Sequence, residues 1–155
     1  MTSAPEKIKS VLGEQIKEYK NLLALLRMER KHLIDFDQEG VEDLAKQKDT
    51  AVLKLRLLEQ ERLRLMEEFS RVSGRRDGMS LQDVSSMTGD GSFLDIRRQL
   101  ISLLQGIQEL NEFNRILIDR SLQYIGDSID FLGKAGARTG RGDGRTKGLV
   151  VSRQI

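Results

Sequence analysis

The chain has 155 residues, enough for one domain with a hydrophobic core, and it contains no cysteine, no tryptophan and one proline. The lack of cysteine excludes a disulfide framework and a thiolate metal site, and the abundance of Leu, Glu, Lys, Arg and Gln favours helices over sheets. The net charge of +2 is uneven: the tail from residue 134 onward carries +5, whereas the remainder of the chain carries −3. No apolar run approaches the roughly 20 residues that a membrane span needs, so we expect a cytoplasmic protein.

The first predicted helix spans about residues 5–37. Pro5 can occupy its first turn, because proline lacks the N–H group that has no partner there. Apolar residues then recur alternately three and four positions apart, which places them on one face of a helix. Gln15 and Glu29 occupy two positions of this seam. The apolar residues of the seam are Ile8, Leu12, Tyr19, Leu22, Leu26 and Leu33.

A break at residues 35–40 separates this helix from the next, and Gly40 is the expected C-cap residue of the first helix. Since the connection is short, the two helices should pack antiparallel. The second helix, residues 41–72, repeats the three-four alternation, and four more apolar residues add a flank beside its seam: Leu53, Leu57, Leu63 and Met66. The seam contains Val41, Leu44, Lys48, Ala51, Leu55, Leu58, Arg62, Leu65, Phe69 and Val72.

Residues 73–91 are rich in glycine and serine, which predicts a loop. Within it, Ser80 and Asp83 have the spacing of a capping box with Asp in place of Glu, which predicts a short helix over residues 81–86. The alternative is a loop without order.

The third predicted helix spans residues 92–132 and has Ser92 as its expected N-cap. Its first stripe is a heptad seam that starts at Phe93 and ends at Phe131. A helix that is buried on one side needs only one stripe, so a second stripe indicates either burial on two sides or a face left free for a partner. The second stripe consists of Ile118, Leu122, Ile125, Ile129 and Leu132.

Asn111 and Asn114 lie one turn apart in the third helix, where asparagine is not favoured by helix propensity. A buried asparagine can fix the register of a coiled coil. The other interpretation is that these amides bind the backbone of a partner.

The predicted fold is all-α: an antiparallel three-helix coiled-coil bundle with a short helix in the second connection. The bundle domain covers residues 1–134, and residues 135–155 form a basic, Gly/Arg-rich, flexible, disordered tail. The alternative is a two-helix hairpin whose third helix is swapped into a dimer. Free protein is therefore expected to be a monomer or a homodimer.

No constellation of catalytic residues is present. His32 is the only histidine, and the spacing Glu29-x-x-His32 would need a second such motif to form a di-iron site. We expect no enzymatic activity, catalytic residue, cofactor, bound metal or small-molecule substrate. The basic tail lacks interleaved aromatic residues, so nucleic acid is not an expected partner either.

Three segments carry a resemblance to a known family. They are the Leu-rich end of the first helix (Leu22-Leu23-Ala24-Leu25-Leu26-Arg27-Met28-Glu29), Lys46-Gln47-Lys48 near the start of the second, and Asn111-x-x-Asn114-x-x-Leu117 running into Ser121-Leu122-x-Tyr124-Ile125. With the Gly-rich tail, this order resembles the FlgN-type flagellar export chaperones of bacteria.

The resemblance implies a cytoplasmic chaperone of flagellar type III protein export, which acts in flagellum assembly. Its clients would be hook-associated proteins one and three, the hook–filament junction proteins, held unassembled through their terminal helical segments and delivered to the flagellar export gate. One departure is that no tyrosine follows Tyr124, whereas tails of the family often carry one.

A client helix could add to the second stripe as a fourth helix. The expected client-binding residues are Asn111, Asn114, Ile118, Leu122, Ile125, Ile129 and Leu132. The alternative function is that of a structural coiled-coil protein that associates with itself and buries the same stripe.

Overall fold

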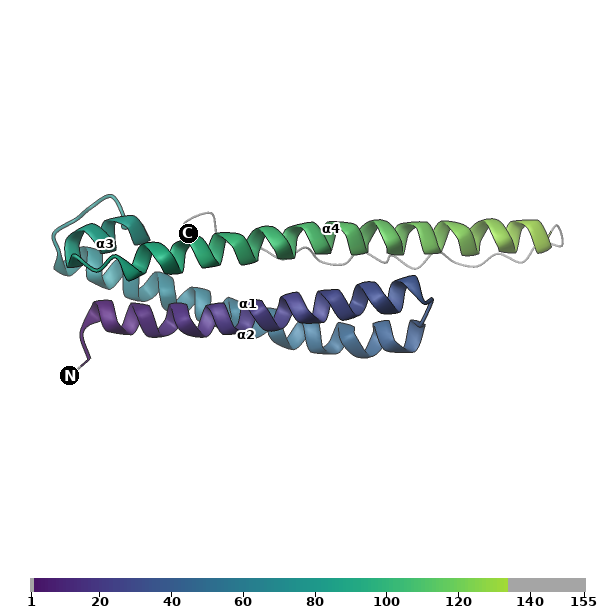
Figure 1. Cartoon of the computed structure of the whole chain (residues 1–155), viewed down its shortest axis with the longest axis horizontal. Helices are drawn as coiled ribbons and strands as arrows, with labels where there is room; N and C mark the ends of the chain where they lie inside the picture. Colours follow the sequence, from purple (N-terminus) through teal and green to yellow (C-terminus); the bar gives the residue numbers. More distant parts are fainter. Residues whose placement is uncertain (1, 134–155) are drawn as a thin grey trace.

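The computed structural model describes residues 2–133, which form four helices and no strand (Figure 1). The helices are α1 (Ala4–Ile34), α2 (Gln38–Val72), α3 (Leu81–Thr88) and α4 (Ser92–Leu132). The all-helical prediction is confirmed, and the limits of the third long helix agree with the expected 92–132. The tail predicted for residues 135–155 lies outside the described residues.

The turn between α1 and α2 differs from the prediction. α1 ends at Ile34, Phe36 has a positive φ of 53°, and the side chain of Asp37 accepts a hydrogen bond from the N–H of Gly40 at 3.0 Å. Asp37 is thus the N-cap of α2, and the expected role of Gly40 as a C-cap is wrong. Gly40 lies in the first turn of α2, where a Cβ atom would come within 2.4 Å of His32 Nδ1.

The short helix in the second connection is confirmed, and it extends to Thr88, two residues beyond the expected 81–86. Ser80 and Asp83 form the predicted capping box, and the side chains of Leu81 and Val84 are fully buried. α3 ends at Gly89, which adopts the left-handed conformation with φ of 71°. α3 packs against α4 and so closes one end of the molecule.

The start of α4 differs from the prediction, because Gly91 is its N-cap. Ser92 is the first helical residue, so its expected role as the N-cap is wrong. Asp90 Oδ1 accepts a hydrogen bond from the backbone N–H of Ser92 at 3.0 Å. The other oxygen of Asp90 forms an ion pair with Lys9 of α1, and the Lys9 ammonium lies 5.1 Å from the centre of the Phe93 ring. These contacts join the first part of α1 to the first turn of α4.

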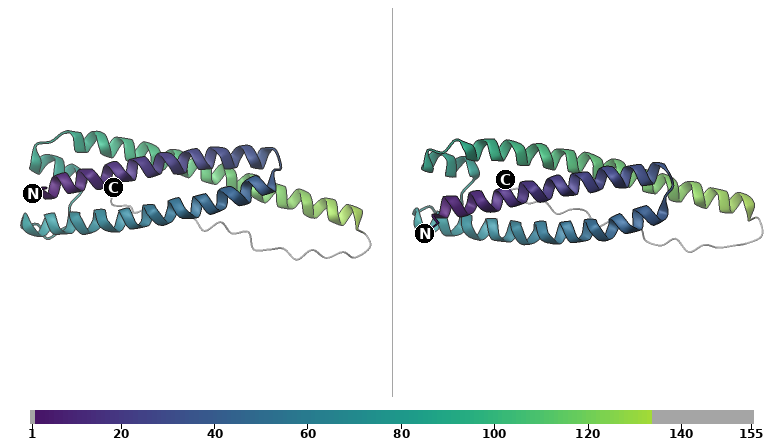
Figure 2. Two further views of the ribbon diagram at one scale, coloured as in Figure 1. Left: turned by 90° about the horizontal axis from the view of Figure 1, so that it is seen from below. Right: turned by 60° about the horizontal axis from the view of Figure 1, so that its bottom comes forward.

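The three long helices do not close into the expected bundle. α1 and α2 form an antiparallel hairpin, and α4 runs beside α1 in the same direction (Figures 1 and 2). α1 packs against both α2 and α4, whereas α2 and α4 have little contact with each other. The antiparallel three-helix bundle is therefore not confirmed: α1 forms the centre of the molecule, and one side between α2 and α4 stays open.

Polar residues of the predicted seams pair inside the hairpin. Glu59 of α2 accepts hydrogen bonds from Gln15 Nε2 at 2.8 Å and from Arg62 Nε at 3.1 Å, and Arg62 is 1% exposed. Burial, with Glu59 nearby, raises the pKa of Tyr19 to about 12. Glu59, which lies beside the predicted seam of α2, therefore neutralises Arg62 and gives Gln15 a hydrogen-bond partner.

Candidate protein-binding surface

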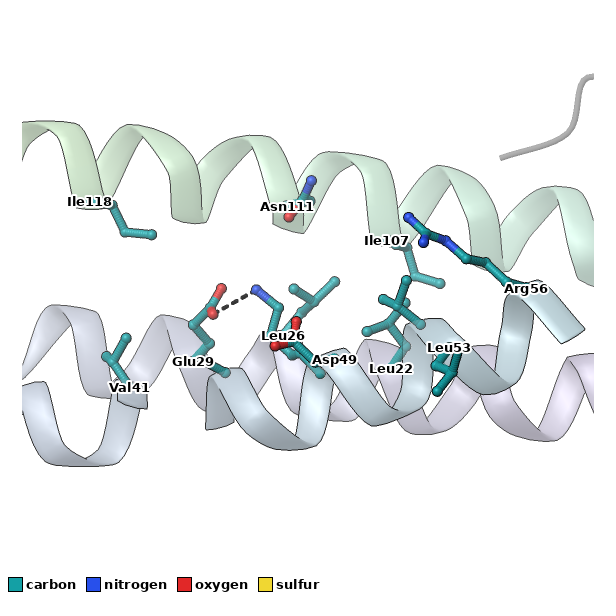
Figure 3. Close-up of a pocket in the computed structure, with 13 residues that line it drawn as sticks. Leu22, Leu26, Glu29, Val41, Asp49, Leu53, Arg56, Ile107, Asn111 and Ile118 are labelled. Atoms are coloured by element: carbon teal, nitrogen blue, oxygen red, sulfur yellow. Dashed lines mark hydrogen bonds and ion pairs between the residues drawn. The ribbon is translucent and has the colours of Figure 1, made fainter. Parts of the chain in front are cut away.

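An open groove of about 600 Å³ lies between α2 and α4, with α1 beneath it (Figure 3). Apolar side chains line most of it, and five polar or charged residues interrupt them. The lining residues are Leu22, Leu26, Glu29, Val41, Ala45, Lys48, Asp49, Val52, Leu53, Arg56, Ile107, Asn111 and Ile118.

A cluster of three polar side chains joins the helices that form the groove. Glu29 of α1 is 3% exposed. Its carboxylate accepts hydrogen bonds from Lys48 Nζ of α2 at 2.8 Å and from Asn114 Nδ2 of α4 at 2.9 Å. Asn114 Nδ2 also donates to the carbonyl oxygen of Leu26 at 2.9 Å. One carboxylate therefore connects all three long helices.

The two asparagines, which the sequence treated alike, have different positions. Asn114 is 1% exposed, and its amide nitrogen is used by α1. Asn111 is only partly buried and lines the groove together with Ile118. Of this pair, only Asn111 presents its side chain to a molecule that enters from outside.

The remaining candidate residues lie farther along α4. Tyr124 lies level with the α1–α2 turn, because its ring centre is 6.5 Å from that of Phe36. Beyond that point α4 extends past the hairpin in all views (Figures 1 and 2). We call residues 125–132 the overhang. Leu122 and Ile125 are half exposed, Ile129 is partly buried, and Phe131 and Leu132 are 83% and 82% exposed.

Both apolar stripes of α4 become exposed where the α1–α2 hairpin ends, near Tyr124. In the first part of α4 the seam residues Phe93, Leu100 and Ile107 are buried against the other helices. The same periodicity continues into the overhang, where no other described helix accompanies it. The overhang therefore presents an apolar helical surface of the kind that packs against another helix.

A comparison with protein families identifies the chain. The model of a family described as FlgN protein matches residues 1–147. The chain belongs to the FlgN family. FlgN proteins are flagellar export chaperones and in general are not enzymes. Neither the curated proteins nor the solved structures yielded a match.

Residues 2–133 contain neither a metal-binding cluster nor a membrane-spanning helix. Within this range no group of three or more His, Cys, Asp or Glu side chains is arranged to hold a metal ion, and no helix is long and apolar enough to cross a membrane. His32 and Glu29, which share the spacing of a metal motif, have separate partners: His32 Nδ1 lies 2.9 Å from Asp37 Oδ2, and Glu29 binds Lys48.

The sequence prediction missed the α2 side of the groove in this FlgN protein. All expected site residues lay on the third helix, yet α2 contributes more than half of the lining, including Val52 and Leu53. Part of the signal was present in the apolar flank predicted beside the seam of α2. Leu53 and Leu57 of this flank are more than half exposed, whereas Met66 is buried. An apolar flank that the hairpin partner does not cover is a mark of a binding surface.

Proposed function

We propose that this FlgN-family chain is a cytoplasmic chaperone of flagellar type III export. It binds the terminal helical segments of hook-associated proteins one and three, prevents their premature assembly and delivers them to the export gate. The observation that supports this most directly is the overhang, where an apolar heptad pattern continues without a helix to cover it.

Client contact is assigned to the exposed part of the expected set. Leu122, Ile125, Ile129 and Leu132 would pack against one face of a client helix, as in other complexes in which an amphipathic helix binds an apolar surface. Asn114 is given a positioning role, because its amide nitrogen already binds Leu26 and Glu29.

The proposal is tested with light scattering on a size-exclusion column. The full chain is analysed alone and mixed with synthetic peptides that correspond to the terminal helical segments of both hook-associated proteins. We expect a monomer that forms a one-to-one complex. A stable homo-oligomer that ignores the peptides would instead support the self-associating coiled coil, since the same apolar residues could pair between two copies.

Substitutions in the overhang locate the contact. Ile125→Glu combined with Leu132→Glu should abolish complex formation while the helical content stays unchanged, because both side chains are at least half exposed. Met28→Glu is the matched control, since Met28 is 50% exposed on α1 and lies outside both the groove and the overhang. Unfolding of the double variant would show that the stripe is part of the core.

A further inference from the structure

We infer that the groove between α2 and α4 is a second docking site, which seats one amphipathic helix of the client about four turns long. The helix would place a basic residue at Asp49 and an acidic residue at Arg56. This inference rests on the proposed function, and it adds a binding surface that is separate from the overhang.

The arrangement of the lining residues supports a helical occupant. Each wall repeats with helical spacing: α2 contributes Val41, Ala45, Val52 and Arg56, and α4 contributes Ile107, Asn111 and Ile118, as Figure 3 shows for most of them. The α2 wall runs over 15 steps of the helix, roughly 22 Å at 1.5 Å per residue. Since α2 and α4 have little mutual contact, the open side between them is where a fourth helix would pack in a four-helix bundle.

The charges of the groove set the chemistry of the occupant. Lys48 Nζ and Glu29 Oε2 form an ion pair at 2.8 Å, so these two charges do not require a charged partner on the ligand. Asp49 and Arg56 also line the groove, but no ion pair or hydrogen bond to either of them occurs within residues 2–133. They lie two helical turns apart on the same face of α2. An apolar stripe with a basic and an acidic residue seven positions apart complements this face.

The same charges argue against the basic tail of this chain as the occupant. The groove has two acidic residues, Glu29 and Asp49, and two basic residues, Lys48 and Arg56, so it has no net charge. Residues 134–155 carry a strong excess of positive charge. A net positive segment gains no overall attraction from a neutral groove, whereas a helix with one charge of each sign gains from both.

A fluorescent label can test where the client binds, because the chain has no cysteine and a single introduced cysteine is labelled selectively. We place the label at Leu53→Cys in the groove and, as a control, at Lys20→Cys on an exposed part of α1 outside it. The probes are the same synthetic peptides. We expect the peptides to protect the groove label, but not the control label, from quenching by iodide.

Two other results of the labelling would overturn the inference. The groove label is unaffected if the peptides bind only at the overhang, and it is shielded before any peptide is added if the tail or a second copy fills the groove. If the peptides do not bind the wild-type chain at all, the proposed function fails first. Binding without protection of the groove label contradicts only the second docking site.

Charge reversal tests the register of the helix. Arg56→Glu should weaken peptide binding about fivefold to tenfold, the effect of a partly exposed ion pair replaced by repulsion. Lys20→Glu carries the same change of charge on α1 and should leave the affinity unchanged. The fold should tolerate both variants, because Arg56 and Lys20 are exposed. Equal affinities for Arg56→Glu and the wild-type chain would contradict the proposed charge pairing.

Discussion

Asn114 shows how one side chain can fix the relative position of three helices. Its amide nitrogen reaches the Leu26 carbonyl and the Glu29 carboxylate, both at 2.9 Å, and Glu29 in turn binds Lys48 of α2. Removing the hydrogen bond from Asn114 would leave the buried Glu29 carboxylate with fewer partners. The free-energy cost would exceed the contribution of the bond itself, because the charge would remain desolvated. The register of α4 on α1 is therefore specified by polar contacts as well as by the apolar seam.

The two asparagines can be separated by substitution. Asn114→Ala should lower the free energy of unfolding by about 2 kcal/mol, since it removes a buried hydrogen bond to a charged group. Asn111→Ala should change stability by less than about 0.5 kcal/mol, because Asn111 is only partly buried, but it should weaken client binding. Urea unfolding and peptide titration measure the two effects. Equal loss of stability in both variants would contradict the division of roles.

The helices themselves were largely predictable, because the three-four alternation of apolar residues marks a helix wherever it is sustained. α4 starts and ends at the expected residues, and the Ser80–Asp83 capping box identified α3. The end of the first helix was predicted too late, because glycine is the residue most typical of a C-cap. The hydrogen bond from the Gly40 N–H to Asp37 instead makes Gly40 part of the next helix. A glycine alone does not show which of two adjacent helices it belongs to.

Asp90 joins α1 to α4, and its effect should depend on pH. The hydrogen bonds with Lys9 and Ser92 lower the pKa of this carboxyl group from 3.8 to about 2. A depressed pKa in the folded state contributes stability above the unfolded pKa, and this contribution is lost as the pH falls from about 4 to about 2. Asp90→Asn should therefore lower the melting temperature at pH 7 by about 2–4 °C.

Thermal melts at several pH values test this expectation. The difference between the wild-type chain and Asp90→Asn should be constant from pH 7 to pH 5 and should shrink below pH 4. Asp77→Asn is the control, because Asp77 is an exposed loop residue. A difference that stays the same at pH 2 would mean that the charge of Asp90 contributes nothing and that only its shape matters.

The open architecture of the whole molecule could not be predicted from periodicity. A heptad seam shows that a face is covered, but it does not show how many neighbours cover it. The second stripe on α4 was compatible with a closed bundle, a swapped dimer or an exposed face. In the structure the stripe lies partly on the groove, at Ile118, and partly beyond the hairpin, at Ile125 and Leu132. The client-binding role of these residues remains a prediction.

The uneven packing of α4 predicts uneven stability along a single helix. The first part of α4 is held by Phe93, Leu100 and Ile107, which are buried, whereas the overhang has most of its apolar side chains exposed. Isolated helical segments shorter than about 12–15 residues are marginal in water, so the overhang depends on tertiary contacts that it lacks among the described residues.

Amide hydrogen exchange measures this difference directly. In the free chain, amides of residues 125–132 should exchange at least about a hundredfold faster than those of residues 96–110, because opening of the overhang breaks no core contact. Addition of a client peptide should slow exchange in the overhang and leave residues 96–110 unchanged. Uniform protection along α4 in the free monomer would contradict an uncovered overhang. Protection that rises with the concentration of the chain alone would instead show that a second copy covers it.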